Sequence, residues 1–224
     1  MQTTPLSAYA SASASRSTPS ETTVVIRPSR GLFDLDLASL WEFREILYFL
    51  VWRDVKLRYK QTAIGAAWAI LQPLATMAIF TVIFGHLAKI PSDGLPYALF
   101  AFTGLLPWIY FSQAIARSGA SVVSDVNLIK KVYFPRLLIP IAAILSPLVD
   151  FVISFVFLLG MVVWFGIRPG WNMLALPFFL ALAMITALAA GLWLSALNVK
   201  YRDVGHTLPF LIQIWMYASP VVYS

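Results

Sequence analysis

Residues 137–167 read LLIPIAAILSPLVDFVISFVFLLGMVVWFGI, and Asp150 is the single charged residue among them. A helix that crosses the hydrocarbon core of a bilayer needs about 20 predominantly apolar residues, so this stretch is long enough to do so. Lipid offers no hydrogen-bond partner to backbone N–H and C=O groups, and an embedded segment must satisfy them internally. The stretch is therefore predicted to be a membrane-spanning helix.

Four further stretches contain no Lys, Arg, Asp or Glu. They are residues 61–85, 94–116, 169–199 and 204–224. A charge at the centre of a membrane span costs roughly 2.5–3.5 kcal/mol, so long uncharged runs mark candidate spans. The alternation of apolar and polar residues that a membrane β-barrel requires is missing. We therefore predict an all-α integral membrane protein with five spans, at about residues 64–86, 96–116, 140–167, 172–197 and 206–224.

The composition agrees with lipid as the surrounding solvent. Of the 224 residues, 60% are hydrophobic and only 12% are charged, whereas soluble domains carry about 25% charged residues. The chain has no cysteine, which excludes disulfides, thiolate metal sites and cysteine nucleophiles. Two histidines are too few for a His-rich metal site. No metal ligand and no catalytic residue is predicted.

The Lys and Arg residues are distributed unevenly between the two sides of the membrane. All but two of the 16 lie before the first span, after span two or after span four; the exceptions are Lys89 and Arg168. By the positive-inside rule the N-terminus is cytoplasmic. The net charge of +6 is assigned to a membrane surface, and no nucleic-acid partner is expected. The sequence stops at YASPVVYS without a closing segment, so we expect a truncated chain; the alternative is a five-span protein.

Two segments precede the first span. Residues 1–22 are rich in Ser, Thr, Ala and Pro and lack the apolar core of a signal peptide. Residues 1–30 are accordingly predicted to be a disordered cytoplasmic tail, and residues 31–224 to be the transmembrane domain. Residues 37–60 are predicted to form a basic amphipathic helix that lies in the headgroup plane. The alternative for this segment is an ordinary soluble amphipathic helix.

Signatures of nucleotide binding and of hydrolysis are missing. The P-loop pattern GxxxxGK[ST] does not occur, and neither does HExxH or GxSxG. Ion-coupled carriers place ionisable residues near the membrane midplane, whereas here Asp150 stands alone. We interpret Asp150 either as a polar contact in a substrate path or, preferably, as a structural residue near the cytoplasmic interface. In the second case it lies beyond a break at Ser146 and Pro147 and pairs with a basic or polar neighbour.

Two cytoplasmic loops carry further polar features. After span two, Leu128, Ile129 and Phe134 are interleaved with lysines. Exposed apolar residues beside positive charge suit either a docking surface for a cytoplasmic partner or a membrane-surface segment held by anionic lipid. After span four, Arg202 and Asp203 are adjacent. They either anchor the loop or pair and fix the geometry between spans four and five.

Aromatic side chains crowd the spans and their ends, and most are expected to pack or to anchor the helices at the membrane interface. A minority could stack on sugar rings along a conduit, because aromatic faces suit the apolar C–H faces of sugars. Spacing alone does not select among the candidates, which are Trp68, Trp108, Tyr110, Phe111, Trp215 and Tyr217.

Three segments together resemble one family. They are VWRDVKLRYKQTAIGAAWAILQPL at 51–74, NLIKKVYFPR at 127–136 and NVKYRDVGHTLPFLIQIWMYASPVVYS at 198–224. In this order and between these spans, they are similar to the permease subunit of type-two ATP-binding-cassette exporters of polysaccharides, O-antigens and teichoic acids. The similarity runs from about residue 24 to the last residue. The family continues beyond this point with re-entrant helices and a sixth span, which this sequence lacks.

The resemblance implies a quaternary arrangement and a location. Family members have an interfacial N-terminal helix and form a homodimer whose central conduit carries a lipid-linked glycan. Two copies of a separate ATPase subunit dock beneath and bind ATP and Mg, so this chain is expected to hold no cofactor. The location implied is the bacterial cytoplasmic (inner) membrane, with membrane lipids as further partners.

The resemblance also implies roles for particular residues. The cytoplasmic gate on the interfacial helix would comprise Arg53, Lys56, Arg58 and Tyr59. The second cytoplasmic loop would contribute Tyr201, Arg202 and Asp203. The segment that couples the permease to the ATPase would comprise Asn127, Leu128, Ile129, Lys130, Lys131, Phe134, Pro135 and Arg136.

The function expected is therefore that of the membrane subunit of an ATP-driven exporter of lipid-linked polysaccharide, and not that of an enzyme. One alternative is a type-two exporter of drugs or lipids. Another is a membrane-embedded polymerase or transferase of glycans, which would need acid–base groups that the short external loops hardly offer.

Overall fold

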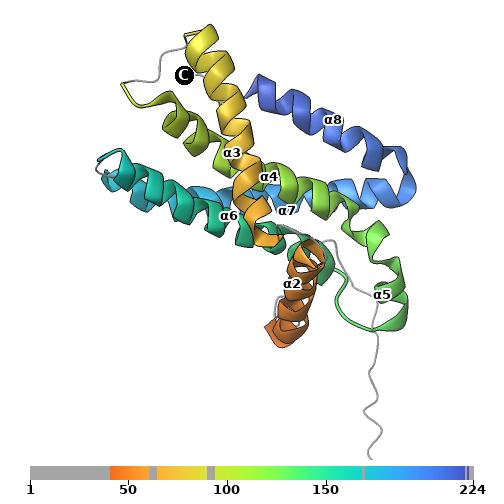
Figure 1. Ribbon diagram of the computed structural model, residues 1–224. Coiled ribbons are helices and arrows are strands. Elements are labelled where there is room, and N and C mark those ends of the chain that lie inside the picture. The colour runs from red at the N-terminus through yellow and green to blue at the C-terminus, as the bar shows by residue number, and fades with distance from the viewer. Residues whose placement is uncertain (1–40, 61–64, 90–93, 168–169, 220, 222–224) are drawn as a thin grey trace, which may run out of the picture. The chain divides into compact units, whose positions relative to one another are not determined.

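The computed structural model of the chain describes residues 41–60, 65–89, 94–167, 170–219 and 221, all within the unit Leu37–Ser224. In these ranges the chain forms helices and short connections, and no strand occurs among them (Figure 1). The prediction of an all-α protein is confirmed. The predicted tail, residues 1–30, and the first residues of the predicted interfacial helix lie outside the described residues.

Four helical segments have the length and apolar composition to cross a membrane: Trp68–Leu87, Tyr97–Ser124, Leu138–Trp164 and Met173–Lys200. They confirm the first four predicted spans. The elements are α2 (Arg44–Tyr59), η2 (Gly65–Ala67), α3 (Trp68–Phe80), which continues as the π-helix η3 (Thr81–Leu87), α4 (Tyr97–Ser124), α5 (Val126–Lys131), α6 (Leu138–Trp164), η4 (Trp171–Ala175), α7 (Leu176–Lys200) and α8 (Asp203–Ala218).

The fifth predicted span, residues 206–224, corresponds to α8. This helix has 16 residues and ends at Ala218, which is shorter than the roughly 20 residues that one crossing needs. Residues 220 and 222–224 lie outside the described residues. The helix is therefore confirmed, while its assignment as a complete span stays a prediction.

Helix α4 is longer than the second predicted span. The end of this span was expected at residue 116 because Arg117 interrupts the uncharged stretch, but α4 continues to Ser124. Ser118 and Ser121 in this extension are buried against the rest of the protein. The helix therefore extends beyond the predicted span, and the point at which it leaves the membrane stays a prediction.

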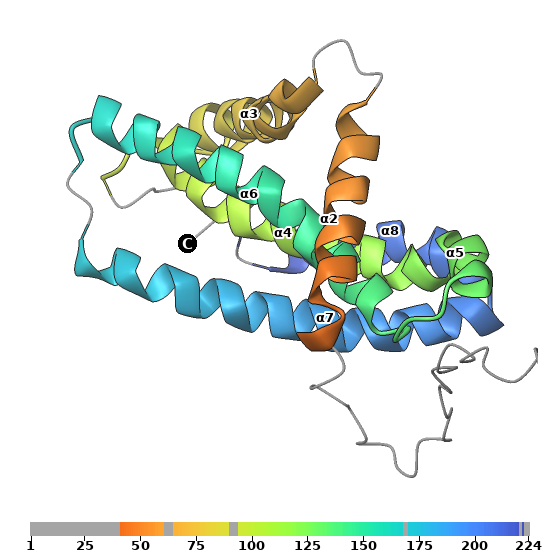
Figure 2. The same cartoon turned by 90° about the horizontal axis from the view of Figure 1, so that it is seen from below.

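Helix α4 lies between α6 and α7 and makes most of its contacts with these two helices (Figures 1 and 2). On the α6 side the contact is aromatic: Tyr110 packs edge-on against Phe151, with 5.7 Å between ring centroids. On the α7 side the buried residues are Ala187, Gly191, Ser195 and Asn198, most of them small. Lipid is as apolar as a leucine side chain, so helices in a membrane gain more from close backbone approach than from burying apolar surface.

The closest approach of α7 to α4 occurs at Gly191. A Cβ atom added there would collide with Ser118 Oγ and lie 2.5 Å from Ser118 Cβ. About two turns further along α7, Asn198 Nδ2 donates a hydrogen bond to the carbonyl oxygen of Gly119 at 3.1 Å. The small residue at position 191 therefore sets the distance between the two helices.

We expect Gly191→Ala to lower the free energy of unfolding by about 1–3 kcal/mol, as overpacking commonly does. Thermal unfolding of the purified protein in detergent measures this. The control is Gly160→Ala on α6, where an added Cβ meets no atom within 4 Å; it should leave stability unchanged or raise it by about 0.5–1 kcal/mol. Adding Ser118→Gly to Gly191→Ala should recover most of the loss, and failure to recover would contradict the steric explanation.

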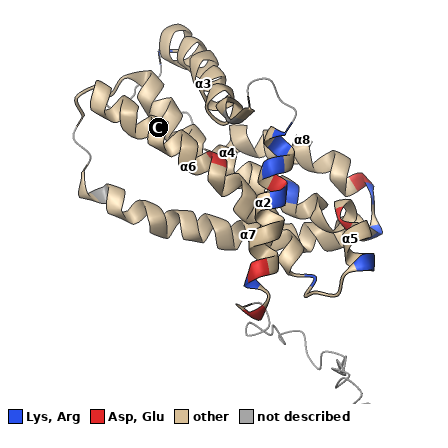
Figure 3. Ribbon diagram, turned by 60° about the horizontal axis from the view of Figure 1, so that its bottom comes forward, with Lys and Arg blue, Asp and Glu red and all other residues tan. Residues whose placement is uncertain are grey.

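Lys and Arg residues gather on α2, around α5 and at the turn between α7 and α8, while α3, α6 and α7 are almost free of them along their length (Figure 3). Figures 1 and 2 place α5 and the α7–α8 turn at the same end of the helices. This arrangement agrees with the predicted assignment of these connections to one membrane side. Which side is cytoplasmic stays a prediction.

Candidate functional site

Helix α2 presents apolar residues on two faces. Leu50 and Val55 are buried against the protein, whereas Tyr48, Phe49 and Trp52 are exposed. Glu in the first turn and Lys and Arg in the last turn match the helix dipole and favour helix formation here. A helix with protein on one side and exposed aromatic and basic residues on the other suits the membrane interface.

The first half of α2 packs against α5 and the start of α6, and Figure 2 shows α2 crossing α6. Leu50 lies in a small core with Phe134 and Leu138, and Leu128 and Ile129 of α5 pack against it. Phe134 is only 7% exposed. Phe134 is therefore not exposed as expected, and Leu128 and Ile129 are only partly exposed, because all three pack toward α2; whether the segment docks a partner or lies on the membrane surface stays open.

The exposed part of the predicted coupling segment combines polar and basic residues with Val132 and Tyr133, which are 47% and 68% exposed. Its exposed side chains include Asn127, Lys130, Lys131 and Arg136, while Pro135 is partly buried. The segment therefore packs Leu128, Ile129 and Phe134 toward α2 and exposes its lysines together with Val132 and Tyr133. Its role in coupling to an ATPase stays a prediction.

Arg53 ties α2 to the connection between α4 and α5. Its Nη2 donates to Asp125 Oδ2 at 2.9 Å and to Asp54 Oδ1 at 2.7 Å, and its Nε donates to Asp54 Oδ1 at 2.9 Å. Burial acts to lower the pKa of Arg53, but the hydrogen bonds to Asp125 and Asp54 outweigh it and raise the pKa. The side chains are about a quarter exposed, so each pair contributes roughly 0–1 kcal/mol.

The end of α2 meets the middle of α6 in a cluster of three ionisable side chains. The Arg58 guanidinium forms an ion pair with Asp150, and the Tyr59 hydroxyl donates a hydrogen bond to the same carboxylate. Arg58 Nη2 also donates to Ser146 Oγ at 3.0 Å. Burial and the nearby charge of Arg117 lower the pKa of Arg58 to about 10, and burial raises the pKa of Tyr59. At neutral pH Arg58 is charged and Tyr59 is neutral.

The expected break in α6 at Ser146 and Pro147 is wrong. The helix is continuous from Leu138 to Trp164, which puts Asp150 roughly 18 Å along it from the first residue at 1.5 Å per residue. Asp150 therefore lies near the middle of α6, while its predicted place near the cytoplasmic interface stays a prediction. Its predicted pairing with a basic and a polar neighbour is confirmed, and this pairing is what lets a carboxylate occupy that position.

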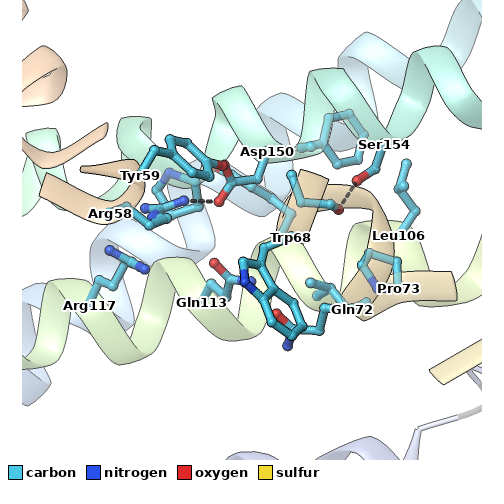
Figure 4. Close-up of a pocket in the computed structure, with 15 residues that line it drawn as sticks. Arg58, Tyr59, Trp68, Gln72, Pro73, Leu106, Gln113, Arg117, Asp150 and Ser154 are labelled. Atoms are coloured by element: carbon cyan, nitrogen blue, oxygen red, sulfur yellow. Dashed lines mark hydrogen bonds and ion pairs between the residues drawn. The ribbon is translucent and has the colours of Figure 1, made fainter. Parts of the chain in front are cut away.

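A polar cavity of about 400 Å³ lies next to this cluster, between α2, α3, α4 and α6 (Figure 4). Trp68 and Gln72 on α3 are exposed, so the cavity is open beside this helix. Ser154 Oγ donates to the carbonyl oxygen of Ala69 at 2.6 Å and holds α3 against α6. The lining comprises Arg58, Tyr59, Trp68, Ala69, Gln72, Pro73, Leu106, Ile109, Tyr110, Gln113, Arg117, Pro147, Asp150, Phe151 and Ser154.

Only half of the predicted gate residues reach this cavity. Arg58 and Tyr59 line it, whereas Lys56 is exposed, with its ammonium 5.5 Å from the centroid of the Trp52 ring. Arg53 instead pairs with Asp54 on α2 and with Asp125, which directly precedes α5.

The second cytoplasmic loop stands apart from the cavity. Tyr201, Arg202 and Asp203 are all exposed. In this described loop no ion pair joins Arg202 to Asp203. The interpretation that these two residues pair and fix the geometry between spans four and five is therefore wrong. Asp203 instead occupies the first turn of α8, where a negative charge is favoured by the helix dipole.

The six candidate conduit aromatics do not form one row. Trp68 and Tyr110 line the cavity, but Tyr110 is buried and its hydroxyl donates to the carbonyl oxygen of Ile144 at 3.4 Å. Tyr217 lies exposed near the end of α8. The remaining three form a separate cluster between α4 and α8, with ring centroids 5.5–6.2 Å apart: Trp108, Phe111 and Trp215.

Sequence reasoning missed four polar residues of the cavity: Gln72, Gln113, Arg117 and Ser154. Gln72 and Gln113 lie inside otherwise apolar spans, and such isolated amides are a signal that could have identified them. Arg117 was counted only as a loop charge. Its position inside α4 could not be inferred, because the spans were predicted as stretches without charged residues and each was therefore ended at its first charge.

Residues 45–224, which include every described helix from α2 to α8 apart from the first residue of α2, match the ABC-2 type transporter family. The chain belongs to this family. This ABC-2 type transporter chain is thus a multi-pass membrane protein of the transport class, as the four apolar helices also indicate. The match extends over the α2–α6 contact and all four helices that border the cavity.

Curated relatives agree with the family assignment. The O-antigen export system permease protein RfbA of Myxococcus xanthus is 33% identical over 186 residues, which are 83% of this ABC-2 type transporter chain and 70% of the relative. A protein of the same name from Klebsiella pneumoniae is 27% identical over 80% of this chain and 69% of its own length. The polysialic acid transport protein KpsM of Escherichia coli is 25% identical, over 76% and 67% respectively.

Proposed function

We propose that this chain is the membrane subunit of an ATP-driven exporter that moves a lipid-linked polysaccharide across the bacterial cytoplasmic membrane. The observation that carries the proposal is its 33% identity over most of its length to a protein named as an O-antigen export permease. The similarity to a polysialic acid transport protein supports a glycan substrate more broadly than O-antigen alone. The cavity between α2, α3, α4 and α6 supplies a polar opening within the predicted spans.

ATP hydrolysis is assigned to a separate ATPase subunit, which binds ATP and Mg. The exposed part of the coupling segment, including Lys130 and Lys131, is the surface proposed to contact it. Force applied there would reach α2 directly, because Leu50 and Phe134 share one small core. From α2 it would reach the cavity through Arg58 and Asp150. Two ATPase copies and a second copy of this chain complete the proposed complex.

The test is a charge reversal on the coupling segment in the native host. Lys130→Glu should abolish copurification of the ATPase and reduce surface polysaccharide severely, because an acidic side chain would repel an acidic docking surface. The matched control is Lys89→Glu, which is exposed and follows η3 on the side predicted to be external; it should leave both measurements unchanged. Unaltered surface glycan after complete deletion of the gene would refute the proposal.

A second candidate is export of a lipid or a drug. The observation that favours it is a largely apolar pocket of about 520 Å³ between α4, α6 and α7, lined by residues such as Leu99, Phe155 and Leu180. The two functions differ in which substrate stimulates the reconstituted ATPase complex. Stimulation by a lipid-linked glycan and not by simple lipids or drugs is expected.

A further inference from the structure

A groove lies along the side of α2 that faces away from α5. It has a volume of about 520 Å³ and is formed by the first half of α2 and by residues 145–153 of α6, which α2 crosses (Figure 2). Phe49 lies on the opposite face of α2, beside α5. None of the residues that line the groove is buried, so no described part of the chain covers it. The α2 residues in the lining recur at the spacing of one helix face: Arg44, Leu47, Tyr48 and Val51.

The groove is apolar except where Arg44 borders it. Among the described residues in the lining, Arg44 is the only charged one, and no ion pair joins it to a described acidic side chain. Its Nη1 donates to the carbonyl oxygen of Trp41 at 3.3 Å, and its guanidinium carbon lies 5.6 Å from the centroid of the Trp41 ring. The neighbouring Glu45 faces the α5 side of α2. A guanidinium has five N–H donors, so Arg44 retains donors and an uncompensated charge beside the groove.

The α6 wall of the groove faces the region where lipid is expected. Helix α6 is long and apolar enough to cross a membrane, and Val152 in the groove is 52% exposed. Residues 145–153 extend about 12 Å along the helix axis at 1.5 Å per residue, which is close to the roughly 15 Å of hydrocarbon in one leaflet. On α2, exposed Trp41 and Tyr48 are of the types that anchor at the headgroup level. The groove thus combines a polar end on α2 with an apolar wall on α6.

We propose that this groove binds one membrane phospholipid, whose phosphate is held by Arg44 and one of whose acyl chains lies against α6. Guanidinium groups form charge-assisted hydrogen bonds to phosphate oxygens, and Leu148 and Val152 offer apolar contacts to the chain. An apolar helix of a second copy of this chain would fill the groove but leave Arg44 without an anion, whereas a phospholipid supplies both parts. The bound lipid holds α2 against α6 on the face opposite Phe49.

The site is separate from the polar cavity, because no residue lines both. The inference goes beyond the proposed function and does not depend on which substrate is exported. Its test needs neither ATPase nor glycan, so loss of this site would leave the export proposal intact. Conversely, a negative result for Lys130→Glu would leave the lipid site intact.

The first test removes the charge at the groove. Native mass spectrometry of the purified full chain, titrated with phosphatidylglycerol in detergent, resolves each bound lipid as a separate mass and gives its Kd. Arg44→Gln should raise the Kd of one tightly bound lipid about fivefold, the contribution usual for an arginine near anionic lipid. The matched control is Lys60→Gln, which removes the same charge at an exposed position after α2 and outside the groove; it should leave the Kd within about twofold. Unchanged affinity in Arg44→Gln, or an equal loss in Lys60→Gln, would overturn the proposal.

The second test fills the groove. Val152→Trp should raise the same Kd about tenfold or more, because the indole occupies the space of the acyl chain. Val156→Trp is the matched control: Val156 is one turn further along α6 and exposed, but does not line the groove. Equal losses in the two variants would contradict the site. If Val152→Trp does not elute as a folded protein, the exposed Arg44 variant decides alone.

The third test separates a phosphate site from a merely greasy surface. Diacylglycerol with the same acyl chains lacks the phosphate and should bind the wild-type chain about fivefold more weakly than phosphatidylglycerol does. This preference should disappear in Arg44→Gln. Equal affinity of the wild type for both lipids would refute the role of Arg44. A dimer that phosphatidylglycerol does not displace and that Val152→Trp dissociates would assign the groove to a second copy and likewise overturn the proposal.

Discussion

Replacing Asp150 with alanine is expected to lower the free energy of unfolding by about 3–5 kcal/mol, because Arg58 is then left buried and charged without its counter-ion. The two side chains are only 17% and 14% exposed, so both charges are largely withdrawn from bulk water. Tyr59 loses its acceptor in the same substitution. Thermal or denaturant unfolding of the purified protein in detergent provides the measurement.

Removing both charges distinguishes the effect of an unpaired charge on stability from the effect of lost packing. The double variant Arg58→Met with Asp150→Leu should be closer to wild type in stability than Asp150→Ala is, since no uncompensated charge remains. Asp54→Ala is a suitable control: it removes a carboxylate from a more exposed pair with Arg53 and should lower stability by roughly 0–1 kcal/mol. The single variants Arg58→Met and Asp150→Leu complete the comparison. If their losses of unfolding free energy simply add up in the double variant, a direct interaction between Arg58 and Asp150 is contradicted.

Replacing Phe134 with alanine is expected to lower the free energy of unfolding by about 3–5 kcal/mol, the usual range for truncating a buried phenylalanine. Phe134 packs with Leu50 and Leu138 where α2 meets the coupling segment. If this contact also transmits force between the ATPase and α2, Phe134→Ala should weaken the stimulation of the ATPase by substrate. Copurification with the ATPase should persist. The measurements are unfolding in detergent and ATPase activity of the reconstituted complex.

The neighbouring aromatic residue provides the control for this variant. Tyr133 is 68% exposed, so Tyr133→Ala removes a ring of similar size without opening a cavity and should change stability by less than about 0.5 kcal/mol. A loss of stability as large in Tyr133→Ala as in Phe134→Ala would show that the core of α2, α5 and α6 does not account for the effect.

The spans could be predicted because lipid imposes a simple rule on sequence: few charges over about 20 residues. The same rule did not show that α4 continues past Arg117, whose charge lies in a cavity that several helices build together. It also failed to exclude a break at Pro147, because Pro is tolerated inside membrane helices when neighbouring groups compensate. Local patterns contain no information about such neighbours.

The candidate site depends on contacts between distant parts of the sequence. Arg58 and Asp150 are far apart in the chain, and nothing near either residue specifies the other. The burial of Phe134 likewise follows from its contact with α2, which the sequence of the segment NLIKKVYFPR alone cannot reveal. The resemblance pointed to Arg58 and Tyr59 as gate residues, but the acidic partner and the amides of the cavity needed three-dimensional structure.

The order of Arg58 and Asp150 along the chain bears on how the protein enters the bilayer during synthesis. The ribosome completes α2 long before α6 emerges, so the guanidinium is available when the helix with its carboxylate leaves the translocation machinery. A lone aspartate at the centre of an inserting helix opposes partition into lipid by roughly 2.5–3.5 kcal/mol, and an earlier cation offsets that penalty at the moment of insertion. A rearranged gene that encodes α2 after α8 should therefore yield less inserted α6, even though the finished polypeptide contains the same pair of residues.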